Sequence, residues 1–190
     1  MKRFLSILLA LVMVFALCAC GGGDKGTADN GEKVVKIGVF EPASGDSGAG
    51  GKKEMLGMQY ANQETPTVEI GGETYKVELV YSDNGSDSAK AVSAASKLVN
   101  EKVSLVLGSY GSGVSMAGGT VFAEAGVPAI GVTCTNPQVT SDCDVYFRIC
   151  FLDPFQGTVL ANYASSELKA KKAYCLGENG NEYDQGLVTF

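Results

Sequence analysis

Apolar runs that favour β-strands alternate along the chain with segments whose apolar residues recur at helical spacing. Strands are predicted at Val34–Phe40, Tyr75–Tyr81, Val103–Leu107, Val127–Gly131, Val145–Ile149 and Ala173–Leu176. Helices are predicted at Gly50–Gln63, Asp87–Asn100, Ser115–Ala125 and from Asp153 to about Lys171. Strands that alternate with helices of about 10 to 15 residues predict right-handed βαβ units, and therefore an α/β fold with a doubly wound parallel sheet.

Local signals predict where the helices begin and end. Ser86 or Asp87 is expected to cap the second helix, and Gly126 is expected to end the third. Asp153 is expected to cap the last helix, with Gln156 reaching back to the cap. The apolar side of the second helix is expected to consist of Val92, Ala95, Leu98 and Val99.

The start of the chain predicts export. Two basic residues precede the apolar run Phe4–Ala16, which ends at Leu17-Cys-Ala-Cys20. This pattern is typical of a lipoprotein signal peptide, residues 1–19, with lipid attached to Cys20 and a flexible tether over residues 20–33. The alternative is an uncleaved membrane anchor, although the run is shorter than the roughly 20 residues that a spanning helix needs. We expect the protein to be extracytoplasmic and lipid-anchored to the outer face of the cell membrane.

Composition excludes several classes of function. The formal net charge is −6, and removal of the signal peptide with its two basic residues would leave −8, which argues against a nucleic-acid partner. There is no histidine and no Cys-x-x-Cys pair, so we expect no zinc site, no metal and no cofactor. A catalytic triad at Ser112 or Cys134 would lack its usual base, and we expect no enzyme, although paired carboxylates stay open as an alternative.

Four cysteines follow the predicted tether. Outside the membrane a disulfide is permitted, and Cys143 with Cys150 is the nearest pair in sequence, but a predicted strand lies between them. The alternative is that the cysteines are free, buried thiols.

Two polar, glycine-containing loops each follow a predicted strand. They are Gly108–Ser115 and Thr133–Pro137. Loops that follow neighbouring parallel strands face one crevice, so these two can converge on one small molecule. Ser112 would lie at a helix start, where free amide groups favour an anion, and Thr135 offers a hydroxyl group. The alternative is that these are ordinary polar turn residues.

A third glycine-rich loop, Ala43–Gly51, suggests a nucleotide site, but it matches neither of the two nucleotide-binding motifs that such a loop could form. A phosphate-binding loop ending at Gly51-Lys52 would need glycine where Asp46 stands and a hydroxyl residue where Lys53 stands. The dinucleotide pattern that begins at Gly48 also fails at Lys53.

Taken with these loops, three further motifs resemble one family from about Val34 to the last residue. The motifs are Val35-Lys-Ile-Gly-Val39, Tyr81-Ser-Asp83 and Phe147-Arg-Ile-Cys-Phe-Leu-Asp-Pro-Phe-Gln-Gly157. The chain resembles the leucine/isoleucine/valine-binding proteins of branched-chain-type ABC importers, which are type I periplasmic binding proteins. This resemblance implies capture of an amino acid and its delivery to an ABC permease in the membrane. A ligand-binding domain of a sensory receptor for small polar metabolites is the alternative.

The resemblance also implies roles for single residues. Ser112 matches the serine that binds the ligand's α-carboxylate, and its neighbours Tyr110 and Gly111 are predicted to line the site with it. Thr133 falls where a carbonyl group accepts from the ammonium, and Thr135 matches a threonine that contacts both ends. Cys134 offers a further backbone carbonyl just after a strand and is also a predicted ligand contact.

Three aromatic or small positions bear on the shape of the pocket. Tyr183 aligns with a tyrosine that closes over the ligand. Tyr110 replaces an aliphatic residue, and Gly50 replaces an aromatic one, which should make that wall roomier.

The family has two lobes and is about twice as long as this chain. Residues 34–150 are accordingly predicted to form the first lobe, and residues 151–190 the crossover and the incomplete start of the second, as in a fragment or truncated product. Closure is expected to pivot near Leu152 and Asp153. The chain alone should bind ligand weakly and expose apolar surface.

Overall fold

The computed structural model describes residues 32–190. The predicted signal peptide and Cys20 lie outside this range. Among residues 32–190, the helices are too short or too polar to span a membrane.

The described strands form a single sheet in the order β2-β3-β1-β4-β5-β6. They are β1 Val34–Glu41, β2 Thr67–Ile70, β3 Glu73–Asp83, β4 Leu105–Leu107, β5 Ala129–Gly131 and β6 Tyr146–Arg148. Every neighbouring pair is parallel except β2 with β3, which form an antiparallel hairpin at one edge. The parallel sheet confirms the predicted fold class. The hairpin was not predicted, although Gly71 and Gly72 both have the positive φ of a tight turn between strands.

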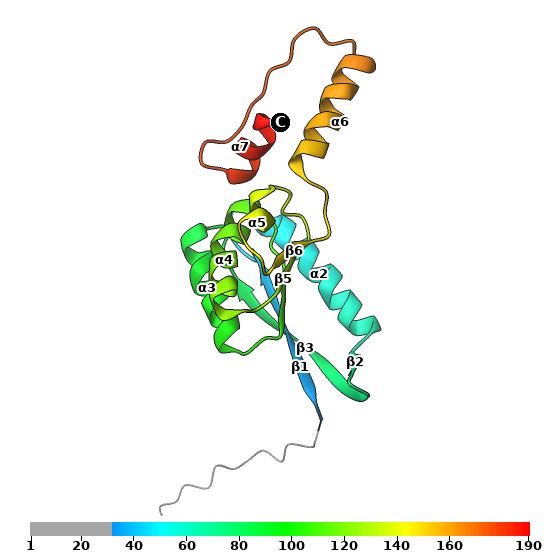
Figure 1. Ribbon diagram of the computed structural model, residues 1–190, viewed down its shortest axis with the longest axis vertical. Helices are drawn as coiled ribbons and strands as arrows, with labels where there is room; N and C mark the ends of the chain where they lie inside the picture. Colours follow the sequence, from blue (N-terminus) through cyan, green and yellow to red (C-terminus); the bar gives the residue numbers. More distant parts are fainter. Residues whose placement is uncertain (1–31) are drawn as a thin grey trace, which may run out of the picture. The chain divides into compact units, whose positions relative to one another are not determined.

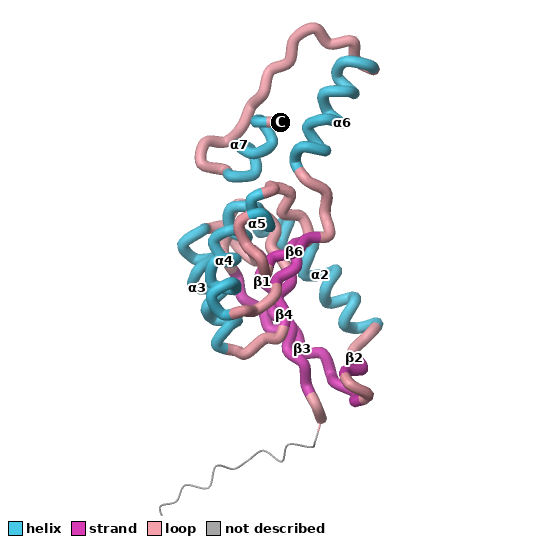
Figure 2. The backbone as a smooth tube through the Cα atoms, in the orientation of Figure 1, coloured by secondary structure: helices cyan, strands magenta, loops and turns pink. Residues whose placement is uncertain are grey.

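Helices cover both faces of this sheet. They are α2 Gly48–Glu64, α3 Ser88–Asn100, α4 Ser112–Ala125, α5 Gln138–Ser141, α6 Asp153–Ser166 and α7 Glu182–Thr189. Helices α3 and α4 lie together on one face, and α2 lies on the other (Figure 1). Helix α6 follows β6 and leads away from the sheet, as the tube in Figure 2 shows. The arrangement is doubly wound, as the alternation of elements predicts.

The core lies between the sheet and helices α3 and α4. Phe40, Leu98, Val106 and Phe122 are completely buried there. The rings of Phe40 and Phe122 meet edge to face at a centroid distance of 5.3 Å. Gly118 allows this contact, because an ideal Cβ there would lie 2.6 Å from the Phe40 ring. Packing of this density ties α4, and the loop before it, to β1.

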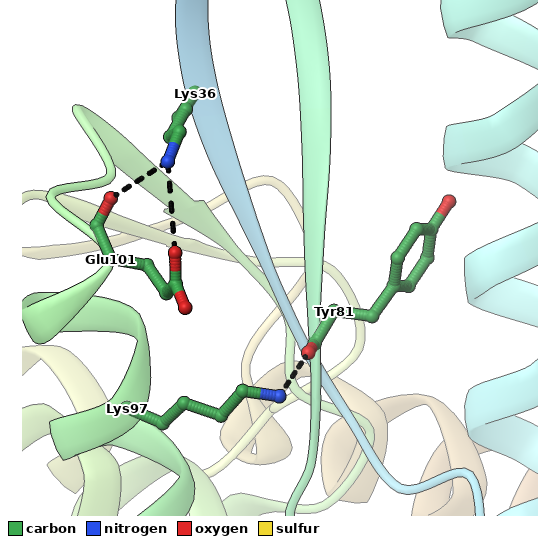
Figure 3. Close-up of polar contacts among 4 residues, drawn as sticks. All are labelled: Lys36, Tyr81, Lys97 and Glu101. Atoms are coloured by element: carbon green, nitrogen blue, oxygen red, sulfur yellow. Dashed lines mark hydrogen bonds and ion pairs between the residues drawn. The ribbon is translucent and has the colours of Figure 1, made fainter. Parts of the chain in front are cut away.

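Polar contacts cap the start of helix α3 and fix its other end to the sheet. Asp87 caps its start by accepting a hydrogen bond from the Lys90 amide at 2.8 Å, as predicted. Near its other end, Lys97 donates to the carbonyl of Tyr81 at 3.1 Å, and Lys36 contacts Glu101 (Figure 3). The predicted apolar side is wrong at Val92, which is 45% exposed, because the buried face runs through Ala91, Ala94, Ala95 and Leu98.

The predictions for the end of the chain need three corrections. The predicted strand Ala173–Leu176 is absent, and Tyr174 and Leu176 are 90% and 87% exposed, because no strand pairs with this segment among the described residues. Helix α6 ends at Ser166 rather than near Lys171. Asp153 is the first helical residue rather than the cap, and Gln156 donates to the Tyr183 hydroxyl at 2.9 Å instead of reaching back.

Candidate functional site

A cavity of about 410 Å³ lies where the two predicted loops meet the start of α7. Its volume falls within the range of about 300–1,000 Å³ typical of small-molecule sites. The lining residues are Ser47, Tyr110, Gly111, Ser112, Thr133, Thr135, Cys150, Phe151, Gln156, Asn181 and Tyr183. None of these described lining residues carries a charge. The structure therefore brings together six of the seven predicted ligand-binding residues, and leaves out Cys134.

The first loop presents the start of α4 to the cavity. Gly111 caps the helix with φ of 105°, a left-handed conformation that favours glycine, and it has no side chain to bond the helix amides. Ser112 is the first helical residue and is 2% exposed. Because the first N–H groups of a helix have no intrahelical partner, they are available to an anion here.

Three polar contacts hold the first loop in place. Asn84 donates its side-chain amide to Ser109 Oγ at 2.8 Å, and the Tyr146 hydroxyl donates to the Gly108 carbonyl at 2.5 Å. The Tyr110 amide donates to Glu41 Oε2 at 2.8 Å. All three partners come from other parts of the sheet, so the loop is ordered without a ligand.

The second loop offers an unpaired hydroxyl group. Thr135 is 6% exposed, and its Oγ1 is buried with no hydrogen-bond partner among the described residues. Its carbonyl accepts from the amide of Asp153 at 3.1 Å, which ties this loop to the first residue of α6. Since a buried polar group without a partner is costly, Thr135 Oγ1 is suited to bind a ligand. The Thr133 hydroxyl, by contrast, donates to Glu54 Oε1.

Arg148 of β6 holds the second loop from behind. Its guanidinium donates to the carbonyls of Cys134 and Asn136, each at 2.8 Å, to that of Pro137 at 3.1 Å and to Thr140 Oγ1 at 2.6 Å. One side chain thus fixes four acceptors, which the rigid fork of arginine allows and lysine does not.

Cys134 does not reach the cavity. It is completely buried, and its Sγ packs so closely that a Cβ on Gly131 would lie 2.1 Å away. Burial raises the pKa of the Cys134 thiol to about 11. The four described cysteines are free, and only Cys134 is fully buried. The prediction concerned the Cys134 carbonyl, which accepts from Arg148 at 2.8 Å, and Cys134 is not among the residues that line the cavity.

The start of α7 closes the far side of the cavity. Tyr183 lines it, and the Tyr183 hydroxyl accepts from Gln156 at 2.9 Å. The Asn181 side chain caps α7 by accepting from the amides of Tyr183 and Asp184 at 3.1 and 3.3 Å. The amides at the start of α7 are therefore already engaged, whereas those at the start of α4 have no side-chain cap.

The space beside Gly50 is occupied by the Tyr110 ring. A Cβ on Gly50 would lie 2.7 Å from that ring. An aromatic group from the opposite loop therefore lies on this wall, where extra space was predicted.

The third glycine-rich loop is tied to the sheet by Asp83. This carboxylate accepts from the amides of Ala43 and Gly85, each at 2.8 Å, and from Ser44 Oγ at 2.7 Å. Although desolvation raises the pKa of Asp83, hydrogen bonds from Ser44, Gly85 and Ala43 more than offset it and leave the pKa below its ordinary value. Asp83 is thus an anchor of this loop.

Sequence reasoning missed the residues that support the two loops from behind. Glu41 and Arg148 are charged residues next to apolar strand residues, and that contrast was the available signal, whereas Glu54 follows two lysines and carried no such signal. The missed lining residues Ser47, Cys150, Phe151, Gln156 and Asn181 come from three segments whose meeting no local pattern predicts. No cluster of metal-ligating side chains is present within residues 32–190.

Known proteins share this fold and much of this sequence. The leucine-binding protein LivK from Thermotoga maritima matches with a TM-score of 0.77 and 36% identity, over 82% of this chain and 44% of that one. The protein LivJ from Streptococcus pneumoniae, solved in complex with isoleucine, has a TM-score of 0.74 and 34% identity. The match covers 83% of this chain and 45% of LivJ. A solute-binding protein from R. palustris, solved in complex with 4-hydroxybenzoate, has a TM-score of 0.69 and 26% identity. The match covers 83% of this chain and 43% of that one.

Comparison of sequences finds relatives of the same kind as comparison of structures. The Leu/Ile/Val-binding protein homolog 2 of Brucella abortus (strain 2308) is 33% identical over 178 residues, which are 93% of this chain and 46% of the relative. The chain thus spans about half the length of the relatives it matches. The profile of the periplasmic binding proteins, a family that binds ligands outside the cytoplasm rather than transforming them, matches residues 34–189. The chain therefore belongs to the periplasmic binding protein family.

Proposed function

We propose that this chain forms the first lobe and the start of the second lobe of a protein that captures an amino acid, branched-chain or related, for an ABC permease. The observation that carries the proposal is the unpaired, buried Thr135 hydroxyl in the same cavity as the uncapped start of α4. A zwitterion needs donors for its carboxylate and acceptors for its ammonium group on one carbon. The two loops offer that combination.

The proposed binding mode places the carboxylate at the start of α4. The helix amides near Ser112 and the Ser112 hydroxyl would donate to it, and the helix dipole would favour its charge. The ammonium would lie at the second loop, where the Thr133 carbonyl and Thr135 Oγ1 can accept. Tyr183 would close over the ligand from the start of α7.

The uncharged lining favours a ligand with no net charge. A zwitterion with an apolar side chain meets that condition, whereas an aromatic acid such as 4-hydroxybenzoate would add one uncompensated negative charge. Phe151 and Cys150 supply an apolar wall for such a side chain. The solved complex of LivJ with isoleucine supports the same ligand class.

Membrane attachment and delivery complete the proposal. Lipid on Cys20 would hold the protein at the outer face of the cell membrane, and the closed, ligand-bound form would be presented to the permease. Closure stabilised by ligand is the means by which the permease could distinguish loaded from empty protein.

Calorimetric titration of the purified chain tests this function. L-leucine, L-isoleucine, L-valine and 4-hydroxybenzoate are compared at neutral pH. We expect a branched-chain amino acid to bind, and Ser112→Ala to weaken binding by about 1.5–3 kcal/mol, as for a hydrogen bond to a charged group. Thr120→Ala removes an exposed hydroxyl from the same helix and should change nothing. Binding of 4-hydroxybenzoate alone would refute the assignment to amino acids.

A further inference from the structure

Two buried carboxyl oxygens behind the cavity have no donor. Glu41, the last residue of β1, is 1% exposed, and its Oε1 has no hydrogen-bond partner among the described residues. The same holds for Oε2 of Glu54, which α2 brings to the same place. Gly108 leaves room for Glu41, since a Cβ there would lie 2.5 Å from Glu41 Oε1. Orphaned buried oxygens of this kind require an explanation.

The two carboxyl groups are partners of one another. The side chain of Glu54 acts on Glu41 both as a hydrogen-bond partner and as a charge, and each effect raises the pKa of Glu41. A hydrogen bond between two carboxyl groups needs a proton, because two carboxylates have no donor between them. Burial, followed by the hydrogen bond and the charge of Glu54, raises the pKa of Glu41 to about 10, against the opposing effect of the Tyr110 amide. Glu41 therefore keeps its proton at neutral pH, and that proton accounts for both orphaned oxygens.

The outer oxygens of this pair reach the two loops of the cavity. Glu41 Oε2 accepts from the Tyr110 amide at 2.8 Å, and Glu54 Oε1 accepts from the Thr133 hydroxyl. Tyr110 and Thr133 both line the cavity. With one proton between the two glutamates, a chain of hydrogen bonds would run from the first loop through both side chains to the second loop.

We propose that Glu41 and Glu54 are positioning residues of the ligand site, joined by one shared proton that sets the spacing of the two loops. The proposal rests on the proposed function, because it concerns the same cavity. Loss of the proton would leave two carboxylates in contact, and their repulsion would separate the loops. Ligand affinity should therefore fall at alkaline pH.

Two ionisable side chains act on the pair, and burial keeps both of them protonated at neutral pH. Tyr146 of β6 faces Glu41, and burial raises its pKa well above 10.0. Cys150 faces Glu54, and burial raises its pKa above 9.0. Arg148 acts on Cys134 and Cys150, but its guanidinium is occupied by the second loop. The second negative charge that ionisation of Glu41 would create has no cation beside it in this set.

Infrared spectroscopy of the full chain tests the shared proton without ligand. At pH 7.5, ordinary carboxyl groups are ionised, so a carbonyl band of a protonated carboxylic acid reports a group such as Glu41. We expect this band in the wild type and in the control variant Glu64→Gln, which changes an exposed glutamate of α2, the helix that carries Glu54. The band should be missing in Glu41→Gln. Absence of the band from the wild type would overturn the proposal.

Calorimetry with L-leucine tests the positioning role. Glu41→Gln imitates the protonated acid, because its amide can donate to Glu54 and accept from Tyr110. It should match the wild type within twofold at pH 7 and bind about fourfold more tightly at pH 10.5, where only about a quarter of the wild type would keep the proton. The ratio of the two affinities cancels the titration of leucine itself. Equal pH profiles for both proteins would overturn the proposal.

Two further variants cut the chain of hydrogen bonds. Glu41→Leu fills the space without polar contacts and should weaken leucine binding at least tenfold at pH 7. If that variant does not fold, Thr133→Val interrupts the other end and should weaken binding several-fold, and unchanged affinity in either variant contradicts a positioning role. If the wild type binds no leucine, the proposed function fails, whereas the infrared band still decides whether the pair holds the proton.

Discussion

The two sides of the cavity belong to regions that are stabilised very differently. Residues 34–150 surround a core in which Phe40 and Phe122 are completely buried. In residues 151–190 the only buried residue is Asp153, and apolar side chains such as Phe155 and Leu160 are 62% and 55% exposed. The expected exposure of apolar surface is confirmed in this part of the described chain.

This difference divides the candidate site into a firm half and a loosely attached half. The loops after β4 and β5 are fixed by Asn84, Tyr146 and Arg148. The start of α7 is bonded to the loop after β5 through the Asn136 side chain, which donates to the Glu182 carbonyl at 2.9 Å. Regions with few buried apolar contacts open locally at low cost. We therefore expect the first half of the site to be preformed and the second half to move.

The largest expected difference in free energy of unfolding is between two phenylalanine substitutions, one in each region. Phe122→Ala should lower the free energy of unfolding by about 3–5 kcal/mol, because it leaves a cavity against Phe40. Phe155→Ala removes a ring from the exposed surface of α6 and should cost at most about 0.5 kcal/mol. Urea unfolding of both variants measures the difference. Equal costs would show that the C-terminal region has a core of its own.

The pH dependence of the free energy of unfolding should come from the firm half of the site, because Glu41 lies there. Native Glu41 holds a proton up to a pKa of about 10, whereas the unfolded residue loses it near 4.5. Between these values the native state binds more protons, so stability should fall as pH rises, by up to about 1.4 kcal/mol per pH unit. Urea midpoints at pH 6, 7 and 8 measure this slope. Glu41→Gln should flatten it, and an unchanged slope would assign the effect to another group.

The two walls of the cavity should respond differently to small changes. Gly50→Ala forces a methyl group against the Tyr110 ring on the firm side, but that ring is 40% exposed and can shift, so the change should cost at most about 1 kcal/mol of stability. Tyr183→Phe on the other side removes only the hydrogen bond with Gln156 and should cost about 0.5–1.5 kcal/mol of ligand affinity. Thermal unfolding and calorimetry separate the two effects. Gly50→Ala combined with Tyr110→Ala should restore the stability that the clash removes.

The smallest expected effects come from two helix caps. Asp87→Ala and Asn181→Ala should each weaken their helix by about 1 kcal/mol. The loss at α3 should appear in global unfolding, because α3 packs in the core. The loss at α7 should appear only as faster amide hydrogen exchange in residues 182–189, and a global effect of Asn181→Ala would contradict the loose attachment of α7.

The sequence predicted the first region well because its signals are local. The apolar runs of β1 and β4 and the cap at Asp87 each depend on a few adjacent residues, and the structure has them where they were expected. The strand predicted at Ala173–Leu176 failed because a strand requires a partner, and β-propensity contains no information about whether one is present.

The candidate site was predictable in its loops and not in their supports. Ser112 and Thr135 follow strands, and the rule that loops after parallel strands share a crevice brought them together. The shared proton of Glu41 and Glu54, and the Tyr110 ring over Gly50, depend on distances between elements far apart in sequence. The composition of the chain and the spacing of its residues do not predict those distances.

The hydrogen bond from the Asp153 amide to the Thr135 carbonyl makes the joint between the two regions part of the candidate site. Rotation of α6 at this joint would pull on the backbone of Thr135, whose hydroxyl group has no hydrogen-bond partner among the described residues. Movement of α6 and binding of a ligand at Thr135 would then be coupled through a single peptide unit. A change in the angle of the crossover would alter the fit of a bound molecule before Tyr183 contacts it.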